Sequence, residues 1–94
     1  MLDQVKPDGV IVATPTEHHL EPSLLSLKAG AHILIEKPIM PNLDECAQVI
    51  EQSKTSQKQV LVAHQRRYYH FVKTARKMIR DGDIGQLVCV SGQW

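Results

Sequence analysis

The stretch Ile33–Met40, with the sequence ILIEKPIM, decides the fold of this 94-residue chain. It begins as a continuous apolar run, which is typical of a parallel strand buried on both faces. Pro38 cannot donate to a sheet ladder and favours an extended backbone at Lys37, so regular pairing should stop there. The stretch therefore predicts a central strand over 33–35. Glu36 and Lys37 follow at its carboxyl end, where open α/β sheets bind their ligands.

Further apolar runs flank this strand at 10–13 (VIVA), 59–63 (QVLVA) and 86–94 (QLVCVSGQW), and each of them is predicted to be a strand. Amphipathic helices are expected between them. Apolar strands that alternate with amphipathic helices favour parallel pairing with right-handed crossovers. The predicted fold class is therefore α/β with an open sheet, in which Thr14-Pro15, Glu36-Lys37-Pro38 and the segment 64–67 follow successive strands at one shared edge.

The three expected helices are defined by apolar spacing and by end signals. Thr16 is predicted to cap the first, with Pro22 near its start and Gly30 in a left-handed conformation after its end. Asn42 is predicted to cap the second, together with Glu45. The side chains predicted to face inward are Leu20, Leu24, Leu25 and Leu27; Leu43, Cys46, Ala47 and Ile50; and Phe71, Val72, Ala75, Met78 and Ile79.

Composition excludes several function classes. The net charge is +1, so no basic surface for nucleic acid is expected. The N-terminus lacks a basic segment followed by an apolar one, and no apolar run approaches the roughly 20 residues that cross a bilayer. Cys46 and Cys89, without CxxC spacing, are interpreted as reduced thiols of a cytoplasmic protein, with a disulfide between them as the alternative. Cys89 is expected in the core.

A glycine-rich phosphate-binding turn is missing. No G-x-G-x-x-G occurs in these residues, although a dinucleotide-binding domain normally carries one after its first strand, followed by an acid about 20 residues later. Gly82 and Gly85 lie at a helix end rather than before a helix start. The pattern therefore indicates a partial doubly wound, Rossmann-like sheet that lacks the glycine-rich first βαβ half.

The chain also carries short motifs at characteristic spacings: Val12-Ala13-Thr14-Pro15, His19, Ala29-Gly30, Glu36-Lys37-Pro38, Arg66-Arg67 and 81–87 (DGDIGQL). Together they resemble the signature of the Gfo/Idh/MocA oxidoreductases. The resemblance implies a dehydrogenase that uses NAD or NADP and acts on sugars, inositols or related polyols. It also implies that residues 1–85 are the C-terminal half of a Rossmann domain, and that residues 86–94 are the first strand of a C-terminal substrate and oligomerisation domain.

Carried over by position, the resemblance implies that Lys37 is catalytic: it would hydrogen-bond the substrate hydroxyl and help to move its proton during hydride transfer. Lysine suits this role, because a partly desolvated ammonium near other cations loses its proton more easily. The residues implied to bind the cofactor are Thr14, Pro15, His19, Glu36, Lys37, Pro38, Arg66 and Arg67. His64-Gln65 and His70 depart from the family pattern, which commonly has an aromatic residue and asparagine, and proline, at these places.

Each of these residues also has a plainer interpretation. Lys37 could be a solvated lysine at a strand end, and Glu36 could form an exposed ion pair with Lys37 or Arg66. Arg66 and Arg67 could be a surface pair that stacks on the neighbouring tyrosines. His19 could merely hydrogen-bond at the start of the helix.

We therefore predict part of an NAD(P)-dependent oxidoreductase with Lys37 as acid/base, although the isolated 94 residues are expected to be inactive. The alternative is a non-catalytic fragment or pseudo-enzyme that acts as an oligomerisation module, because half a doubly wound sheet leaves open edges. The expected partners are a sugar- or polyol-like molecule and further copies of the chain, without nucleic acid or membrane. No metal site is expected, since His18 and His19 as helical neighbours point about 100° apart.

Overall fold

The computed structural model describes residues 1–92, which fall into two compact units that are described separately. The first unit is Met1–His64, and the second begins at Gln65. Within the described residues, no helix is both long and apolar enough to cross a membrane. The division predicted after residue 85, between a Rossmann half and a second domain, stays a prediction.

The first unit is built on a three-stranded parallel sheet. Its strands are β1 (Gly9–Val12), β2 (His32–Ile35) and β3 (Val60–Val62), in the order β1-β2-β3. Val12 pairs with Ile35, and Ile35 pairs with Val62, so the three strands end together. Apart from Gly9 and His32, the residues of the three strands are β-branched or leucine, as the pleated surface favours. The predicted α/β class with parallel strand–helix alternation is confirmed.

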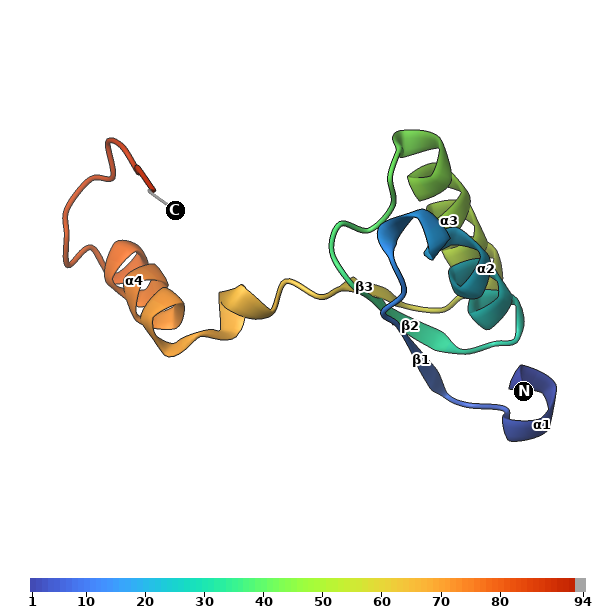
Figure 1. Cartoon of the computed structure of the whole chain (residues 1–94). Helices are drawn as coiled ribbons and strands as arrows, with labels where there is room; N and C mark the ends of the chain where they lie inside the picture. Colours follow the sequence, from blue (N-terminus) through green and yellow to red (C-terminus); the bar gives the residue numbers. More distant parts are fainter. Residues whose placement is uncertain (93–94) are drawn as a thin grey trace. The chain divides into compact units, whose positions relative to one another are not determined.

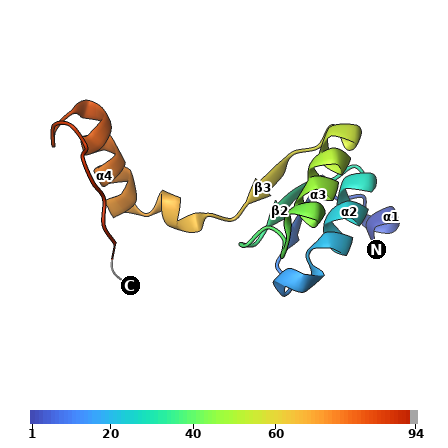
Figure 2. The ribbon, with the colours of Figure 1, turned by 90° about the horizontal axis from the view of Figure 1, so that it is seen from above.

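Two helices cover one face of this sheet. Figures 1 and 2 show α2 (Leu20–Lys28) and α3 (Leu43–Ser56) side by side on the same side of the strands. A short helix, α1 (Leu2–Val5), precedes β1, and a 3₁₀ turn, η1 (Thr16–His18), precedes α2. The buried core lies between the helices and the sheet and contains Val12, Leu27, Ala31, Ile33, Ile35, Met40 and Val49.

The opposite face of the sheet is open. Ile11 and Leu61 are 72 % and 63 % exposed, and Leu34, which pairs with both, is half-buried. The prediction that the central strand is buried on both faces is therefore wrong for one face. The alternation of side chains along β2 directs Ile33 and Ile35 to the helices and Leu34 to the uncovered side.

The helix ends follow the sequence signals with one exception. Gly30 has φ of +84°, and Pro22 is the third residue of α2. Asn42 caps α3: its Oδ1 accepts from the Glu45 N–H at 2.9 Å, and its Nδ2 donates to Glu45 Oε1 at 2.8 Å. The predicted Thr16 cap is wrong, because Thr16 begins η1, which delays the start of α2 to Leu20.

The predicted inward face of α3 is wrong in part. Leu43 and Ile50 are 85 % and 51 % exposed and Ala47 is exposed, whereas Val49 is buried and Cys46 packs against the core. The apolar positions of this helix form two adjacent stripes, and periodicity alone does not choose between them. Packing against α2 and the sheet selects the stripe that contains Cys46 and Val49.

The second unit contains a 3₁₀ turn, η2 (Gln65–Tyr68), and one helix, α4 (His70–Asp81). The predicted inward residues of this helix are exposed except for Val72, which is half-buried; the exposed ones are Phe71, Ala75, Met78 and Ile79. Their spacing correctly predicted the helix but not the burial. A helical stripe becomes buried only where another surface covers it.

Residues 86–92 form no strand, contrary to the prediction. An isolated extended segment has no partner for its backbone N–H and C=O groups, so water satisfies them instead. Cys89 is exposed rather than in the core, and both cysteines are free thiols. The last two residues of the predicted strand lie outside the described residues.

Candidate functional site

The carboxyl ends of β1, β2 and β3 form one edge in the first unit. The ladder reaches this edge, because the Glu36 N–H donates to Val12 O at 2.9 Å and the Ala63 N–H donates to Ile35 O at 2.8 Å. The segments that leave the strands at this edge begin with Ala13, Glu36 and Ala63. The shared edge that the sequence predicted is present in the fold.

The loop after β1 contributes Thr14 and Pro15, both exposed. The Thr14 hydroxyl donates to His18 O at 3.1 Å, and Pro15 O accepts from the His18 N–H at 2.8 Å. These two bonds tie the loop to η1 and leave the Thr14 side chain at the surface. Because its hydrogen is donated to His18 O, the Thr14 hydroxyl keeps only its acceptor capacity.

The loop after β2 contributes Glu36, Lys37 and Pro38. The Lys37 N–H donates to Glu36 Oε2 at 2.8 Å, so the half-buried carboxylate is held by the backbone of its neighbour. Lys37 and Pro38 are exposed, and the peptide bond between them is cis. Among the ion pairs of the described residues, none joins Glu36 to the Lys37 ammonium. The Lys37 side chain is therefore exposed at the edge and is not neutralised by Glu36.

His19 is the one predicted site residue that is buried, with 1 % exposure. Its Nε2 lies 2.8 Å from Thr14 O, and its Nδ1 lies 3.0 Å from Ile39 O. The ring thus contacts both loops of the edge, the one after β1 and the one after β2. Sequence reasoning placed His19 near the cofactor but did not find these partners, because backbone carbonyls leave no signal in the side-chain sequence.

Arg66 and Arg67 lie in η2 and belong to the second unit. Both side chains are exposed. Lys73 Nζ lies 5.7 Å from the ring centroid of Tyr68, so the tyrosine of this turn stacks with a lysine of α4. The predicted approach of the two arginines to the nicotinamide stays a prediction.

A hollow of about 650 Å³ lies beside the loop after β1, among η1, α2 and the start of α3. Its lining includes Leu20, Leu24 and Leu25 together with the carboxylates of Glu17, Glu21 and Glu45. Three carboxylates against the single ammonium of Lys28 give the lining a net negative charge, which disfavours the phosphates of a dinucleotide. Lys37 is not part of its lining. No cluster of three metal-ligating side chains occurs in the part of the chain that the structure describes.

The sequence of residues 1–64 matches the model of the Gfo/Idh/MocA family, described as an oxidoreductase family with an NAD-binding Rossmann fold. The chain belongs to this family. The matched segment coincides with the compact unit that contains the sheet and the edge. The family's NAD-binding function therefore falls on the unit that carries Thr14, Glu36 and Lys37.

Relatives of this family are similar over most of the chain. The 2,7-anhydro-N-acetylneuraminate hydratase of Escherichia coli is 33 % identical over 86 % of the chain and 22 % of its own length. The inositol 2-dehydrogenase of Corynebacterium glutamicum is 32 % identical over 90 % of the chain and 26 % of its own length. The chain thus spans about a quarter or less of the length of these curated relatives.

A solved structure has the same fold. The inositol dehydrogenase homolog of Azotobacter vinelandii, complexed with NADH and myo-inositol, superimposes with a TM-score of 0.76 at 32 % identity. The match covers 84 % of the chain and 21 % of that structure. The family's cofactor is NAD(P), and a member with this fold has been observed with NADH bound.

The edge of the first unit carries polar groups of three kinds. Thr14, Glu36 and Lys37 offer a hydroxyl, a carboxylate and an ammonium at the carboxyl ends of parallel strands, where Rossmann folds bind their ligands. The sequence contains no glycine-rich turn of the kind that binds the pyrophosphate of a dinucleotide. The loop between β1 and η1 contains no glycine, so it lacks the tight turn that lets a backbone approach phosphates.

Proposed function

We propose that this chain supplies the nicotinamide-facing part of an NAD(P)-dependent oxidoreductase site, with Lys37 as the acid/base for a sugar- or polyol-type hydroxyl. The observation that carries the proposal is the position of Lys37. It is exposed, lies two residues after the end of the central strand β2, and has no ion-pair partner among the described residues. A reacting hydroxyl at this edge would meet a flexible amine that no carboxylate of the described residues pairs with.

A bound NAD(P) would supply the hydride acceptor for the carbon that bears the hydroxyl. In that direction Lys37 Nζ, as the neutral amine, would accept the hydroxyl proton, so the products would be a carbonyl group and the lysine ammonium. In the reverse direction the ammonium would return the proton. General acid–base catalysis of this kind contributes about 10²- to 10⁴-fold to a rate. Glu36 contributes by holding the Lys37 N–H, which fixes the backbone from which the amine extends.

The substrate class rests on the relatives. One is an inositol 2-dehydrogenase, and the structural neighbour holds myo-inositol, so a polyhydroxylated ring is the natural first substrate to test.

The remaining roles belong to the same proposal. The cofactor contacts would come from Thr14, Pro15, Pro38, Arg66 and Arg67. Residues 1–85 would be the C-terminal half of a Rossmann domain and residues 86–94 the start of a second domain, in a cytoplasmic homo-oligomer.

The test is turnover of inositols and hexoses with NAD and NADP by the complete protein and by two variants at position 37. Lys37→Ala should lower kcat by about 10²- to 10⁴-fold, because the proton loses its acceptor. Lys37→Arg keeps the positive charge but cannot accept a proton, so it should be almost as slow. The dissociation constant for NADH should change far less than kcat. Near-normal turnover by Lys37→Ala would overturn the catalytic role.

The same experiment separates the alternatives. The isolated 94 residues should show no turnover, which provides the baseline. A complete protein that turns over no substrate and binds no NADH would favour the non-catalytic oligomerisation module.

One relative is a hydratase, and adding water to a substrate leaves the cofactor's oxidation state unchanged. Loss of substrate without net NADH formation would therefore favour a hydration or dehydration reaction at the same site. Product analysis should accompany the absorbance assay for this reason.

A further inference from the structure

The buried ring of His19 connects the two loops of the candidate site. Thr14, whose carbonyl it contacts at 2.8 Å, lies in the loop after β1; Ile39, whose carbonyl it contacts at 3.0 Å, lies two residues after Lys37. The backbone of His19 is held as well, because its carbonyl accepts from the Ser23 hydroxyl at 2.6 Å and from the Ser23 N–H at 3.2 Å. The ring therefore projects from a fixed point of the fold.

Both partners of the ring are carbonyl oxygens, which only accept hydrogen bonds. A neutral imidazole has one N–H and one lone pair, so it can satisfy one carbonyl while its lone pair opposes the other. An imidazolium has two N–H groups and satisfies both. The two distances, 2.8 and 3.0 Å, both lie in the range of N–H···O hydrogen bonds.

The buried ring is surrounded by carbonyl dipoles rather than by a counter-charge. Within the described residues no carboxylate forms an ion pair with the ring, so the two carbonyl dipoles are its polar partners. The charged side chains on the adjoining segments, Glu17, Glu21, Glu36 and Lys37, are exposed or half-buried. Among the described residues no buried side-chain nitrogen or oxygen lacks a partner, so both ring nitrogens are engaged.

We propose that His19 is a positioning residue that donates from both ring nitrogens and clamps the Lys37 loop to the Thr14 loop. Its consequence for catalysis rests on the proposed role of Lys37, whereas the clamp itself does not. Without the clamp, the backbone from 37 to 39 would lose its tie to the Thr14 loop and would be anchored to β1 only through the Glu36 N–H, which donates to Val12 O. The amine of Lys37 would then be held less firmly at one place on the edge. A misplacement of about 1 Å can cost about 10²-fold in rate.

The direct test is NMR of the protein with ¹⁵N-labelled histidine. Two slowly exchanging ring N–H signals are expected for His19, one on each nitrogen, and none for the exposed neighbour His18. A single protonated nitrogen on His19 would overturn the two-sided clamp. This readout needs no variant and no activity, so it stands or falls independently of Lys37.

Variants then test the positioning role in the complete protein. His19→Leu donates to neither carbonyl, whereas His19→Gln can donate to one; His18→Gln is the matched control at an exposed position. The His18 amide donates to Pro15 O, and the Glu36 amide donates to Val12 O. The hydrogen-exchange rates of both amides should rise by about 10-fold or more in His19→Leu and stay unchanged in the control. Should His19→Leu not fold, His19→Gln gives the same comparison with a smaller effect. Unchanged exchange in a folded His19→Leu protein would contradict the clamp.

Kinetics provide the second readout. His19→Leu should lower kcat by about 10- to 10²-fold with a smaller change in KM, and His19→Gln should recover part of the loss. Equal kcat in both variants and in the wild type would overturn the positioning role. If Lys37→Ala were fully active while the ring signals and exchange rates matched expectation, the clamp would stand and the proposed acid/base function would fall.

Discussion

The two units of this chain have similar local patterns but different burial. In Met1–His64, helices cover a sheet and bury a core around Ile35, Leu27 and Val49, all at 0 % exposure. In the described part of the second unit, 65–92, no side chain is buried, although α4 carries a continuous apolar stripe. The sheet makes the difference: it offers the helices of the first unit a flat apolar surface, and α4 has no such surface within its own unit.

This contrast shows that amphipathic spacing reports where a helix could be buried, not whether it is. Most of a helix's stability in a protein comes from tertiary packing of its apolar face. The first unit should therefore resist unfolding cooperatively, and α4 should depend on helix ends and ion pairs. Predictions that compare the two units test this directly.

The largest expected effect compares two isoleucines. Ile35 is fully buried in β2, whereas Ile79 in α4 is 41 % exposed. Ile35→Ala should lower the free energy of unfolding by about 2–5 kcal/mol, because it removes buried methyl groups and leaves a cavity. Ile79→Ala should change it by less than about 0.5 kcal/mol. Urea unfolding followed by circular dichroism measures both.

Leucines within one helix supply the control. Leu27 is fully buried and Leu25 is 50 % exposed on the same helix, α2, so Leu→Ala at each position changes the same chemistry in different surroundings. The Leu27 variant should be the less stable of the two. If Ile79→Ala proved as damaging as Ile35→Ala, the stripe of α4 would be buried in solution and the contrast between the units would be wrong.

A smaller effect is expected at the helix starts. Asn42 caps α3 through its side chain, whereas Tyr69, at the equivalent place before α4, makes no such bond. Asn42→Ala should cost about 1 kcal/mol in the stability of the first unit. Tyr69→Asn should raise the helix content of α4, because it adds an acceptor for the orphan N–H groups. An unchanged helix signal for Tyr69→Asn would mean that α4 is stabilised by contacts other than its ends.

Much of the first unit could be predicted from its residues. Short β-branched runs such as Val10–Val12 need a partner strand from elsewhere in the chain, and the helical segments between such runs favour parallel crossovers. The parallel sheet and its shared edge could therefore be predicted. The cap at Asn42 and the turn at Gly30 followed because each depends on one side chain or on its absence. These are local rules, and the fold obeys them.

What could not be predicted depends on neighbours. The choice between Leu43 and Val49 as the buried residue of α3 is made by α2 and the sheet, which periodicity does not describe. The 86–92 segment has strand composition but no ladder partner. The partners of His19 are backbone oxygens, whose positions are fixed only when both loops are folded. In each case the missing information is tertiary.

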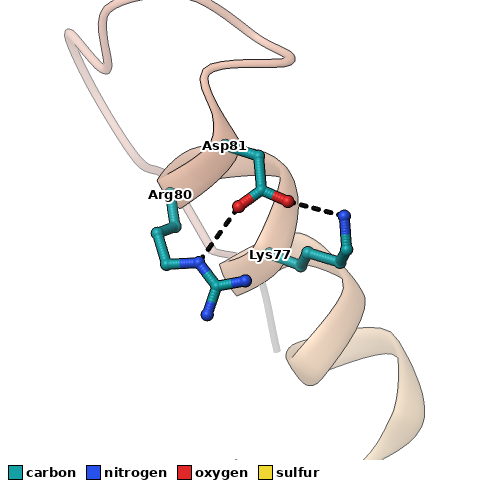
Figure 3. Close-up of polar contacts among 3 residues, drawn as sticks. All are labelled: Lys77, Arg80 and Asp81. Carbon is teal, nitrogen blue, oxygen red and sulfur yellow. Dashed lines mark hydrogen bonds and ion pairs between the residues drawn. The ribbon is translucent and has the colours of Figure 1, made fainter.

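The smallest predicted effect concerns the end of α4. The Asp81 carboxylate lies between Lys77 and Arg80 (Figure 3). Its Oδ2 is 2.5 Å from Lys77 Nζ, and its Oδ1 is 3.0 Å from Arg80 Nε. An acid in the last turn opposes the helix dipole, and a lysine four residues before an acid is the weaker orientation of such a pair. The two cations therefore offset an unfavourable placement, in a setting that solvent screens.

The hydrogen bonds from Lys77 and then Arg80 lower the pKa of Asp81 below its ordinary 3.8. Because the folded pKa is below the unfolded value, the stabilisation is complete above the unfolded pKa and is lost as pH falls through the folded one. The helix signal of α4 should thus stay constant from pH 7 to about 5 and decline slightly in the acid range below. Asp81→Asn should remove that decline, and molar salt should shrink it. A carboxyl titration of Asp81 by ¹³C NMR with a midpoint at or above 3.8 would show that the two cations do not hold the carboxylate in solution, and α4 would then depend on its apolar stripe after all.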